Sequence, residues 1–199
     1  MNRLKGSLIY LAGGIEYLPD LGIDWRQKAE FELRKLGIGI LNPQDKATNF
    51  ANEGYNEQAN LQNLRKAAKL ARKEGKIDLA LEIRKEISRI MREIVRADLR
   101  MVDLASAILC RIDSTRHTAG TYAELTQAYL QRKPVILYCE TGIEDIPLWW
   151  WGHGNRSMFF SSLDESIDYI RHIDQDEVIE HHKQWKFFNF DKVFGNEKS

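Results

Sequence analysis

The sequence has little cysteine and little proline, no long apolar run and no excess of charge of one sign. Its 199 residues include two cysteines and four prolines. Cys110 and Cys139 both lie in short apolar runs, where they indicate buried strands rather than a disulfide framework. Their spacing is not that of metal ligands, and we expect neither a metal ion nor a cofactor.

The apolar runs are too short for a membrane protein. None approaches the ~20 residues that a membrane span requires, and the first residues lack the apolar segment of a secretory signal peptide. The 29 basic and 29 acidic residues give a formal net charge of zero, which counts against the basic surface of a nucleic-acid-binding protein. We therefore expect a cytoplasmic protein that acts on small molecules, with neither a nucleic acid nor a membrane as partner.

What the sequence does contain is an alternation of strand and helix patterns. Residues 7–12 form an apolar run that predicts a buried strand. Apolar residues spaced by 4, 4 and 3 then predict a helix over 24–36, with Asp24 and Gln27 as a capping pair. Further strands are predicted at 38–41, 105–110, 134–139 and 157–160, and further helices at 121–131 and 163–173.

This alternation predicts an α/β fold with a doubly wound, mainly five-stranded parallel sheet. We assign 1–199 to a single domain, into which a charged stretch, 56–97, inserts two helices. Apolar residues 79, 83, 87, 90 and 94 form a stripe on the second of these helices. Residues 174–199 are expected to pack on the domain or on a neighbouring subunit.

Ligands of parallel sheets bind beyond the carboxyl ends of the strands. The most informative stretch at such a place is Gly-Thr-Tyr-Ala-Glu, residues 120–124. A carboxylate in the first turn of a helix stays ionised, because it faces free backbone N–H groups and the positive end of the macrodipole, and an ionised Glu124 could act as a nucleophile. Alternatively, Thr121 and Glu124 form a capping box. Taken alone, these five residues favour the capping box over a nucleophilic Glu124.

The order of motifs along the chain resembles that of the nucleoside 2-deoxyribosyltransferase family. A tyrosine-bearing strand that ends at Gly-Gly, a strand that runs into Asn-Pro-Gln, an Asp-x4-Asp pair, the Gly-Thr-x2-Glu stretch and a Lys-Pro-Val-Ile strand follow one another within 7–45 and 97–152. The resemblance, which includes the related 2'-deoxynucleoside 5'-monophosphate N-hydrolases, implies a flavodoxin- or Rossmann-like sheet. It implies cleavage or transfer at the N-glycosidic bond of a 2'-deoxyribonucleoside or its 5'-monophosphate.

The resemblance also implies catalytic roles. Glu124 matches the family's nucleophile, which forms a covalent deoxyribosyl-enzyme, and Tyr10 matches the tyrosine that holds it. Asp98 stands where an aspartate assists the departure of the nucleobase, and Gln44 where a glutamine helps to hold the base. The chemistry needs these types, because an oxocarbenium-like transition state is stabilised by a close carboxylate while a second acid protonates the leaving base.

Further residues are expected to bind the substrate. Asp103 is expected to raise the pKa of its neighbour Asp98, as an acid that protonates the base requires. The loop 114–118 offers groups that suit a 5'-phosphate, and three successive indoles, 149–151, cannot all face one core. The predicted substrate-binding residues are Gly13, Gly14, Gln44, Asp103, Ser114, Arg116, His117, Thr118, Gly120, Trp149 and Trp151.

Some questions stay open at this level. Thr118 stands where the family often has an aspartate that meets a sugar hydroxyl, and Pro147 where an asparagine reaches the 5'-hydroxyl in the neighbouring subunit, so a free nucleoside and a phosphorylated one are both possible. The aromatic segment and the resemblance predict a homodimer or a higher homo-oligomer with shared active sites. The alternatives are a non-catalytic nucleotide-sensing module and a phosphoribohydrolase of the cytokinin-activating type, which usually has Pro-Gly-Gly where this chain has His-Thr-Ala.

Overall fold

The structure is a computed structural model that describes residues 3–15, 20–45, 57–116, 118–152 and 158–175. The chain divides into two compact units, whose positions relative to one another are not determined. The sheet unit consists of Met1–Pro43 and Met101–Ser199, and the helical unit of Gln44–Arg100. The predictions for His117 and for the segment 176–199 lie outside the described residues.

All neighbouring strands of the sheet unit run parallel. In spatial order they are β2 (Gly39–Leu41), β1 (Leu8–Gly13), β3 (Ala107–Ile112), β4 (Val135–Cys139) and β5 (Phe159–Phe160). The predicted doubly wound, five-stranded parallel sheet is confirmed. Successive strands are added in opposite directions on the two sides of β1 and β3, and such a switch point is where ligands bind in sheets of this kind.

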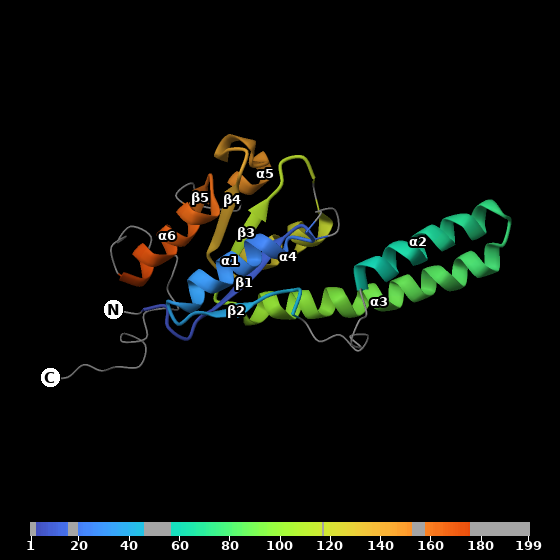
Figure 1. Cartoon of the computed structure of the whole chain (residues 1–199), viewed down its shortest axis with the longest axis horizontal. Helices are drawn as coiled ribbons and strands as arrows, with labels where there is room; N and C mark the ends of the chain where they lie inside the picture. The colour runs from blue at the N-terminus through green and yellow to red at the C-terminus, as the bar shows by residue number, and fades with distance from the viewer. Residues whose placement is uncertain (1–2, 16–19, 46–56, 117, 153–157, 176–199) are drawn as a thin grey trace. The chain divides into compact units, whose positions relative to one another are not determined.

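Helices cover both faces of this sheet (Figure 1). Helices α1 (Ile23–Arg34) and α6 (Leu163–Gln175) pack against one face, and α4 (Ala119–Leu130) packs against the other. Two short helices, η1 (Ile143–Asp145) and α5 (Leu148–Trp151), follow β4. Because both faces are covered, the strands are apolar at nearly every position, as their sequences predict.

Alternate residues of each strand serve the two cores. In β1, Ile9 and Leu11 pack with α1 and α6, whereas Tyr10 and Ala12 face α4. All four side chains are fully buried. The two-residue period of the strand therefore places Tyr10 on the side of the sheet where α4 carries Glu124.

The described part of the helical unit contains two helices, as predicted. They are α2 (Glu57–Lys73) and all but the end of α3 (Ile77–Leu104). Leu61 of α2 packs with Ile90 and Ile94, two residues of the predicted apolar stripe. The assignment of the whole chain to one domain with an insertion at 56–97 stays a prediction.

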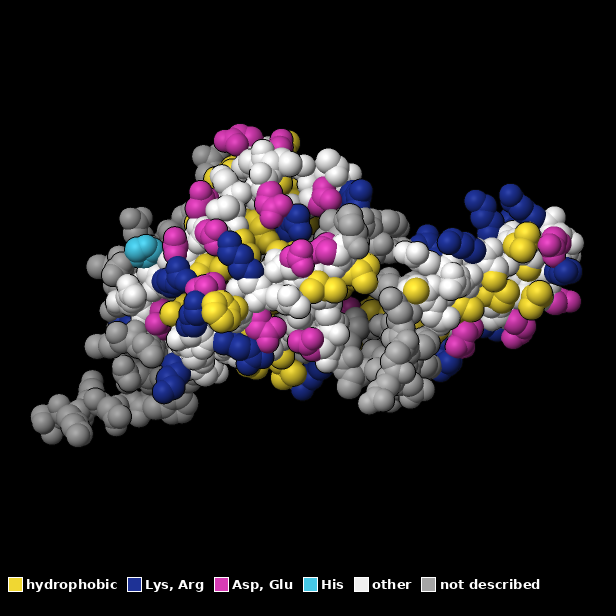
Figure 2. All heavy atoms as spheres, in the orientation of Figure 1, with side chains coloured by type: hydrophobic (Ala, Val, Ile, Leu, Met, Phe, Trp, Pro, Cys, Tyr) yellow, Lys and Arg dark blue, Asp and Glu magenta, His cyan; other side chains and the backbone are white. Residues whose placement is uncertain are grey.

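Both units present charged side chains of both signs, in line with the balanced composition (Figure 2). The helical unit also exposes hydrophobic side chains along its length. Leu79, which the predicted stripe includes, is 51% exposed. The stripe is thus exposed at its first residue and buried at its last two, Ile90 and Ile94. No helix in the described part of the chain is long and apolar enough to cross a membrane.

Candidate active site

A buried phenol and a buried carboxylate meet on the α4 side of the sheet. The Tyr10 hydroxyl donates a hydrogen bond of 2.9 Å to Oε1 of Glu124. Tyr10 is fully buried and Glu124 is 8% exposed. Strand β1 supplies the tyrosine, and α4 supplies the glutamate directly after β3. Since β1 and β3 are paired neighbours, the topology brings together two residues that are 114 positions apart in the sequence.

The place of Glu124 on its helix differs from the prediction. Helix α4 begins at Ala119, and its N-cap residue is Thr118 in an extended conformation, with no hydrogen bond from the cap side chain to the helix backbone. The hydroxyl of Thr118 donates to the hydroxyl of Thr121 at 2.7 Å instead. Both first-turn predictions, the capping box and the macrodipole contact of Glu124, are therefore wrong, because the early start moves Glu124 into the second turn, beyond the reach of the dipole.

Two further ionisable side chains lie within electrostatic range of Glu124. Arg26 of α1 is fully buried. Burial lowers the pKa of its guanidinium, while electrostatic interactions with Tyr10 and Glu124 act in the opposite direction. Burial also raises the pKa of the Cys110 thiol of β3 well above its ordinary value; the charge of Glu124 adds to this effect and Arg26 opposes it. A carboxyl group, a guanidinium, a phenol and a thiol, all buried, thus share this part of the protein.

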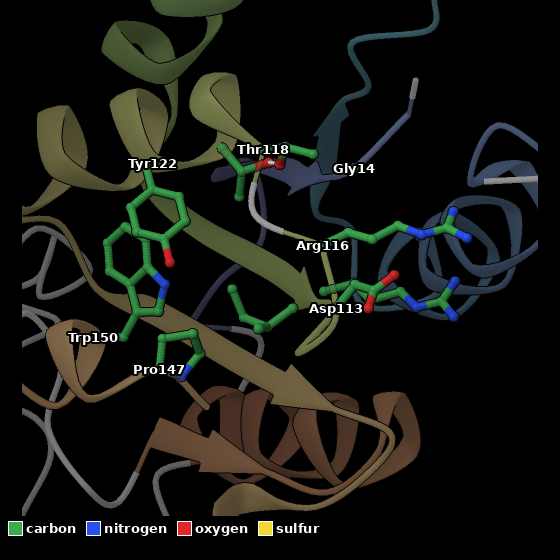
Figure 3. Close-up of a pocket in the computed structure, with 10 residues that line it drawn as sticks. Gly14, Asp113, Arg116, Thr118, Tyr122, Pro147 and Trp150 are labelled. Atoms are coloured by element: carbon green, nitrogen blue, oxygen red, sulfur yellow. Dashed lines mark hydrogen bonds between the residues drawn. The ribbon is translucent and has the colours of Figure 1, made fainter. Parts of the chain in front are cut away.

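A pocket lies at the carboxyl edge of the sheet (Figure 3), where the strand topology predicts a ligand. The space that it encloses is about 510 Å³, open solvent at the mouth included. Thr121, which lines it, precedes Glu124 by three residues, so the two side chains share one face of α4. The lining residues are Gly14, Arg111, Ile112, Asp113, Arg116, Thr118, Thr121, Tyr122, Pro147 and Trp150.

The pocket has an aromatic side and a charged side. The rings of Tyr122 and Trp150 stand with centroids 4.5 Å apart and planes tilted by 45°. Asp113 and Arg116, from the loop after β3, lie on the other side (Figure 3). Partial burial opposes ionisation of Asp113, but hydrogen bonds from the hydroxyl and N–H of Thr115, helped by the nearby arginines, outweigh it and lower the pKa of the carboxyl group.

Two successive glycines, Gly13 and Gly14, stand at the end of β1, so the backbone there carries no side chains. Gly13 has a φ of +147°, and a Cβ atom there would come within 3.1 Å of the Arg111 carbonyl oxygen and 3.2 Å of the Trp25 ring. Gly14, the next residue, lines the pocket. Of the Gly-Gly pair, Gly14 therefore lies at the pocket, whereas Gly13 stands outside the lining and approaches Arg111 and Trp25 closely.

The predicted substrate-binding loop is only partly at the pocket. Arg116 and Thr118 line it. Ser114 stands outside the lining, with its hydroxyl oxygen 3.1 Å from that of Thr141. Gly120 is exposed in the first turn of α4, also outside the lining.

Three further predicted site residues are not placed at the pocket. Asp103 precedes β3, whose opposite end reaches the pocket, and its carboxylate accepts hydrogen bonds of 2.6 Å from the amides of Gln127 and Gln131. Gln44 and Asp98 belong to the helical unit, whose position relative to the sheet unit is not determined. The roles of these two residues stay predictions, and so does the effect of Asp103 on Asp98.

The three successive indoles lie in three different environments. Trp150 is fully buried and lines the pocket, whereas Trp149 is 63% exposed. The Nε1–H of Trp151 donates to the Ile146 carbonyl at 3.2 Å, and its ring packs edge-on against Phe159. The structure thus puts Trp150 at the pocket, where the sequence analysis expected Trp149 and Trp151, because the helical turn of α5 directs successive side chains about 100° apart.

Sequence reasoning missed several residues that the site contains. Tyr122 lies within the stretch that we singled out, yet its spacing from Trp150 gives no sign of contact. Arg26 offered a signal: it stands three residues before Ala29 and seven before Leu33, on the buried stripe of α1. A charged residue on a buried stripe needs specific partners. In the described ranges, no group of three or more His, Cys, Asp or Glu side chains is arranged to hold a metal ion.

A doubly wound sheet with a pocket at its switch point, beside a buried acid held by a phenol, defines an α/β protein with a small-molecule site. The sequence model described as nucleoside 2-deoxyribosyltransferase matches residues 9–146, a span that includes Tyr10 and Glu124. The chain belongs to the nucleoside 2-deoxyribosyltransferase family. Membership indicates an activity of the nucleoside 2-deoxyribosyltransferase kind, on small-molecule substrates.

Solved structures resemble the chain in fold at low sequence identity. A conserved protein from Enterococcus faecalis V583 is 15% identical, with a TM-score of 0.51, and the match covers 83% of this chain and 98% of that one. A 2-deoxyribosyltransferase from the psychrotolerant bacterium Bacillus psychrosaccharolyticus is 21% identical, with a TM-score of 0.47, over 82% of this chain and 92% of that one. No curated protein matches the sequence.

Proposed function

We propose that the protein cleaves or transfers at the N-glycosidic bond of a 2'-deoxyribonucleoside or its 5'-monophosphate, through a covalent glycosyl-enzyme on Glu124. The observation that carries this proposal is the hydrogen bond of 2.9 Å from the buried Tyr10 hydroxyl to Glu124. A donor of this kind favours the ionised form of a carboxylate and fixes its orientation. Both properties are what a carboxylate nucleophile requires.

The first half of the reaction forms the covalent intermediate. An oxygen of Glu124 attacks the anomeric carbon, the bond from that carbon to the base nitrogen breaks with its electron pair leaving on the base, and an acid protonates the base. We assign the acid role to Asp98 from the family resemblance. Because the transition state resembles an oxocarbenium ion, the negative charge of Glu124 stabilises it before the new bond is complete.

The second half releases Glu124. Water, or a nitrogen of a second base, attacks the same carbon and gives its proton to the Asp98 carboxylate, and Glu124 leaves as a carboxylate. Hydrolysis and transfer therefore use the same intermediate and differ only in the acceptor. Product analysis with and without an added base distinguishes them.

The two sides of the pocket support a nucleotide substrate. The ring of Tyr122, which packs on the buried ring of Trp150, suits a flat nucleobase, and the guanidinium of Arg116 with the Thr118 hydroxyl suits a phosphate. Thr118 and Pro147 replace the two family groups that meet a sugar hydroxyl and the 5'-hydroxyl, respectively. We therefore favour the 5'-monophosphate, in a cytoplasmic homodimer or higher homo-oligomer with shared active sites.

The test is mass spectrometry of the intact protein mixed with deoxynucleosides and their 5'-monophosphates. Released base together with a glycosyl adduct on Glu124 is the expected result. Glu124→Gln should lose both, while Glu144→Gln, a change of an exposed glutamate on η1, should keep both. Binding of a nucleotide without released base or adduct would contradict catalysis and favour the nucleotide-sensing module.

A second experiment tests the preference for a 5'-phosphate by comparing activity on monophosphates and on free nucleosides. Arg116→Met should weaken activity on monophosphates more than on free nucleosides, whereas Arg34→Met, on the exposed face of α1, should change neither. An equal loss on both substrates would contradict the phosphate assignment. Faster cleavage of ribonucleotides than of deoxyribonucleotides would favour the phosphoribohydrolase alternative.

A further inference from the structure

Helix α3 carries a second apolar stripe, which is exposed. We call it the outer stripe, and its members, between 38% and 54% exposed, are Ile77, Leu81, Met91 and Val95. Their spacings of 4, 10 and 4 residues keep them on one face of the helix. The last three directly follow the buried residues Ala80, Ile90 and Ile94. The outer stripe therefore lies about 100° around the helix from the buried side.

The outer stripe matches itself when a second copy of α3 is laid against it in the opposite direction. If the pair is centred on residue 86, Ile77 lies opposite the partner's Val95, and Leu81 lies opposite the partner's Met91. Each of these contacts occurs twice, because the same surface is present on both copies. This is the property of an isologous interface, which a two-fold axis generates.

The charges beside the outer stripe fix the antiparallel direction. Asp78 and Glu82 directly follow members of its first half. Arg92 and Arg96 directly follow members of its second half, and all four side chains are exposed. Neither arginine forms an ion pair with another residue that the structure describes. An antiparallel partner sets the acids of one copy against the arginines of the other, whereas a parallel partner would set like charges against each other, which is unfavourable.

The middle of the outer stripe is polar, and its cations have partners. Lys85 and Arg89 each form an ion pair with the glutamate three residues earlier, at 2.7 Å and 2.6 Å. Arg84 lies between the two apolar halves of the stripe and comes opposite the partner's Ser88, whose hydroxyl can accept a hydrogen bond. These contacts reduce the repulsion between the cations of two copies.

Other occupants of the outer stripe fit the charges less well. All the charged side chains of α2 that the structure describes are positive, so two copies that met through α2 would bring like charges together. An anionic lipid surface attracts basic side chains, but it would meet Asp78 and Glu82 beside the first half of the stripe. A second copy of α3 suits both halves.

We propose that a second copy of this chain docks on the outer stripe, through antiparallel pairing of the two α3 helices. The pairing removes four exposed apolar side chains of each copy from water, and the burial of apolar surface is the main driving force of association. The homo-oligomer proposed above rests on shared active sites, whereas this contact joins helical units. It depends neither on Glu124 nor on turnover, so the proposed function can fail while this proposal holds.

The test is analytical ultracentrifugation of the full chain over a range of concentrations. The unsubstituted protein should gain mass reversibly as its concentration rises. Leu81→Glu should raise the dissociation constant of this step by about tenfold or more, because it places a carboxylate opposite the partner's Met91. Leu79→Glu is the matched control, since Leu79 is 51% exposed on the same helix but lies off the outer stripe. It should associate like the unsubstituted protein.

An exchange of charges tests the direction of the pair. Glu82→Arg and Arg92→Glu should each weaken the association, because each sets like charges against each other, and the double variant should restore it. Circular dichroism checks that every variant keeps its helices. Equal association of Leu81→Glu and Leu79→Glu would overturn the proposal, and so would a double variant as weak as the single ones. A protein that stays monomeric and binds vesicles of phosphatidylglycerol would overturn it in favour of a lipid surface.

Discussion

Removal of one hydroxyl group, in Tyr10→Phe, tests the contact on which the proposed chemistry depends. The hydroxyl donates to Glu124 at 2.9 Å, and both side chains are buried. A hydrogen bond to a charged group contributes about 1.5–3 kcal/mol to stability. The free energy of unfolding at neutral pH is therefore expected to fall by about 1.5–3 kcal/mol in Tyr10→Phe, because water cannot replace the lost donor at a buried carboxylate.

Tyr138 provides a matched control within the same sheet. It is also fully buried, packs edge-on against Trp25 with ring centroids 5.9 Å apart, and its hydroxyl has no hydrogen-bond partner among the residues that the structure describes. Burial raises the pKa of this phenol, so the hydroxyl stays protonated at neutral pH. An unpartnered buried hydroxyl costs roughly 1–3 kcal/mol. Tyr138→Phe is therefore expected to be neutral or stabilising.

Urea unfolding followed by circular dichroism measures both variants. The slope against urea should stay constant, so that a change of midpoint reports stability. A double-mutant cycle measures the interaction between Tyr10 and Glu124 directly. In a Glu124→Gln background, Tyr10→Phe should lower the free energy of unfolding clearly less than it does in the unsubstituted protein, since the acceptor is no longer charged. The reasoning is refuted if Tyr10→Phe and Tyr138→Phe have the same effect, or if the cycle shows no coupling between Tyr10 and Glu124.

Three further outcomes are expected. Trp150→Ala should lower the free energy of unfolding by about 3–5 kcal/mol in urea, because it leaves a large cavity, whereas Trp149→Ala, at an exposed position, should stay within about 0.5 kcal/mol. Cys110 should resist iodoacetamide in the folded protein at any pH below its ordinary pKa of 9.0, since burial and Glu124 raise its pKa, and should react after unfolding. Labelling of folded Cys110 at neutral pH would contradict this assignment. Asp113→Asn should lower the melting temperature at neutral pH and matter less well below pH 3.8, because a carboxyl group with a lowered pKa stabilises the fold when ionised and loses that contribution on protonation. An equal effect at both pH values would count against the hydrogen bonds from Thr115.

The order of strands and helices could be predicted because buried parallel strands are continuous apolar runs. The helix ends could not. Asp24 and Gln27 suggested a cap for the first helix, yet α1 begins at Ile23, and the carboxylate of Asp20 accepts the backbone N–H groups of Gly22 and Asp24. Which residue first takes helical dihedral angles is a local choice of the backbone, which the spacing of apolar residues does not fix.

The candidate site was predictable where the order of motifs defines it and not where packing does. Tyr10 and Glu124 follow from that order, and the structure brings them into contact. Which of three successive indoles turns inward depends on the phase of a helix of four residues, so Trp150 could not be chosen from the sequence. Arg26 donates to the carbonyls of Leu11 and Gly13 at the end of β1, and these acceptors are brought to it only by the fold.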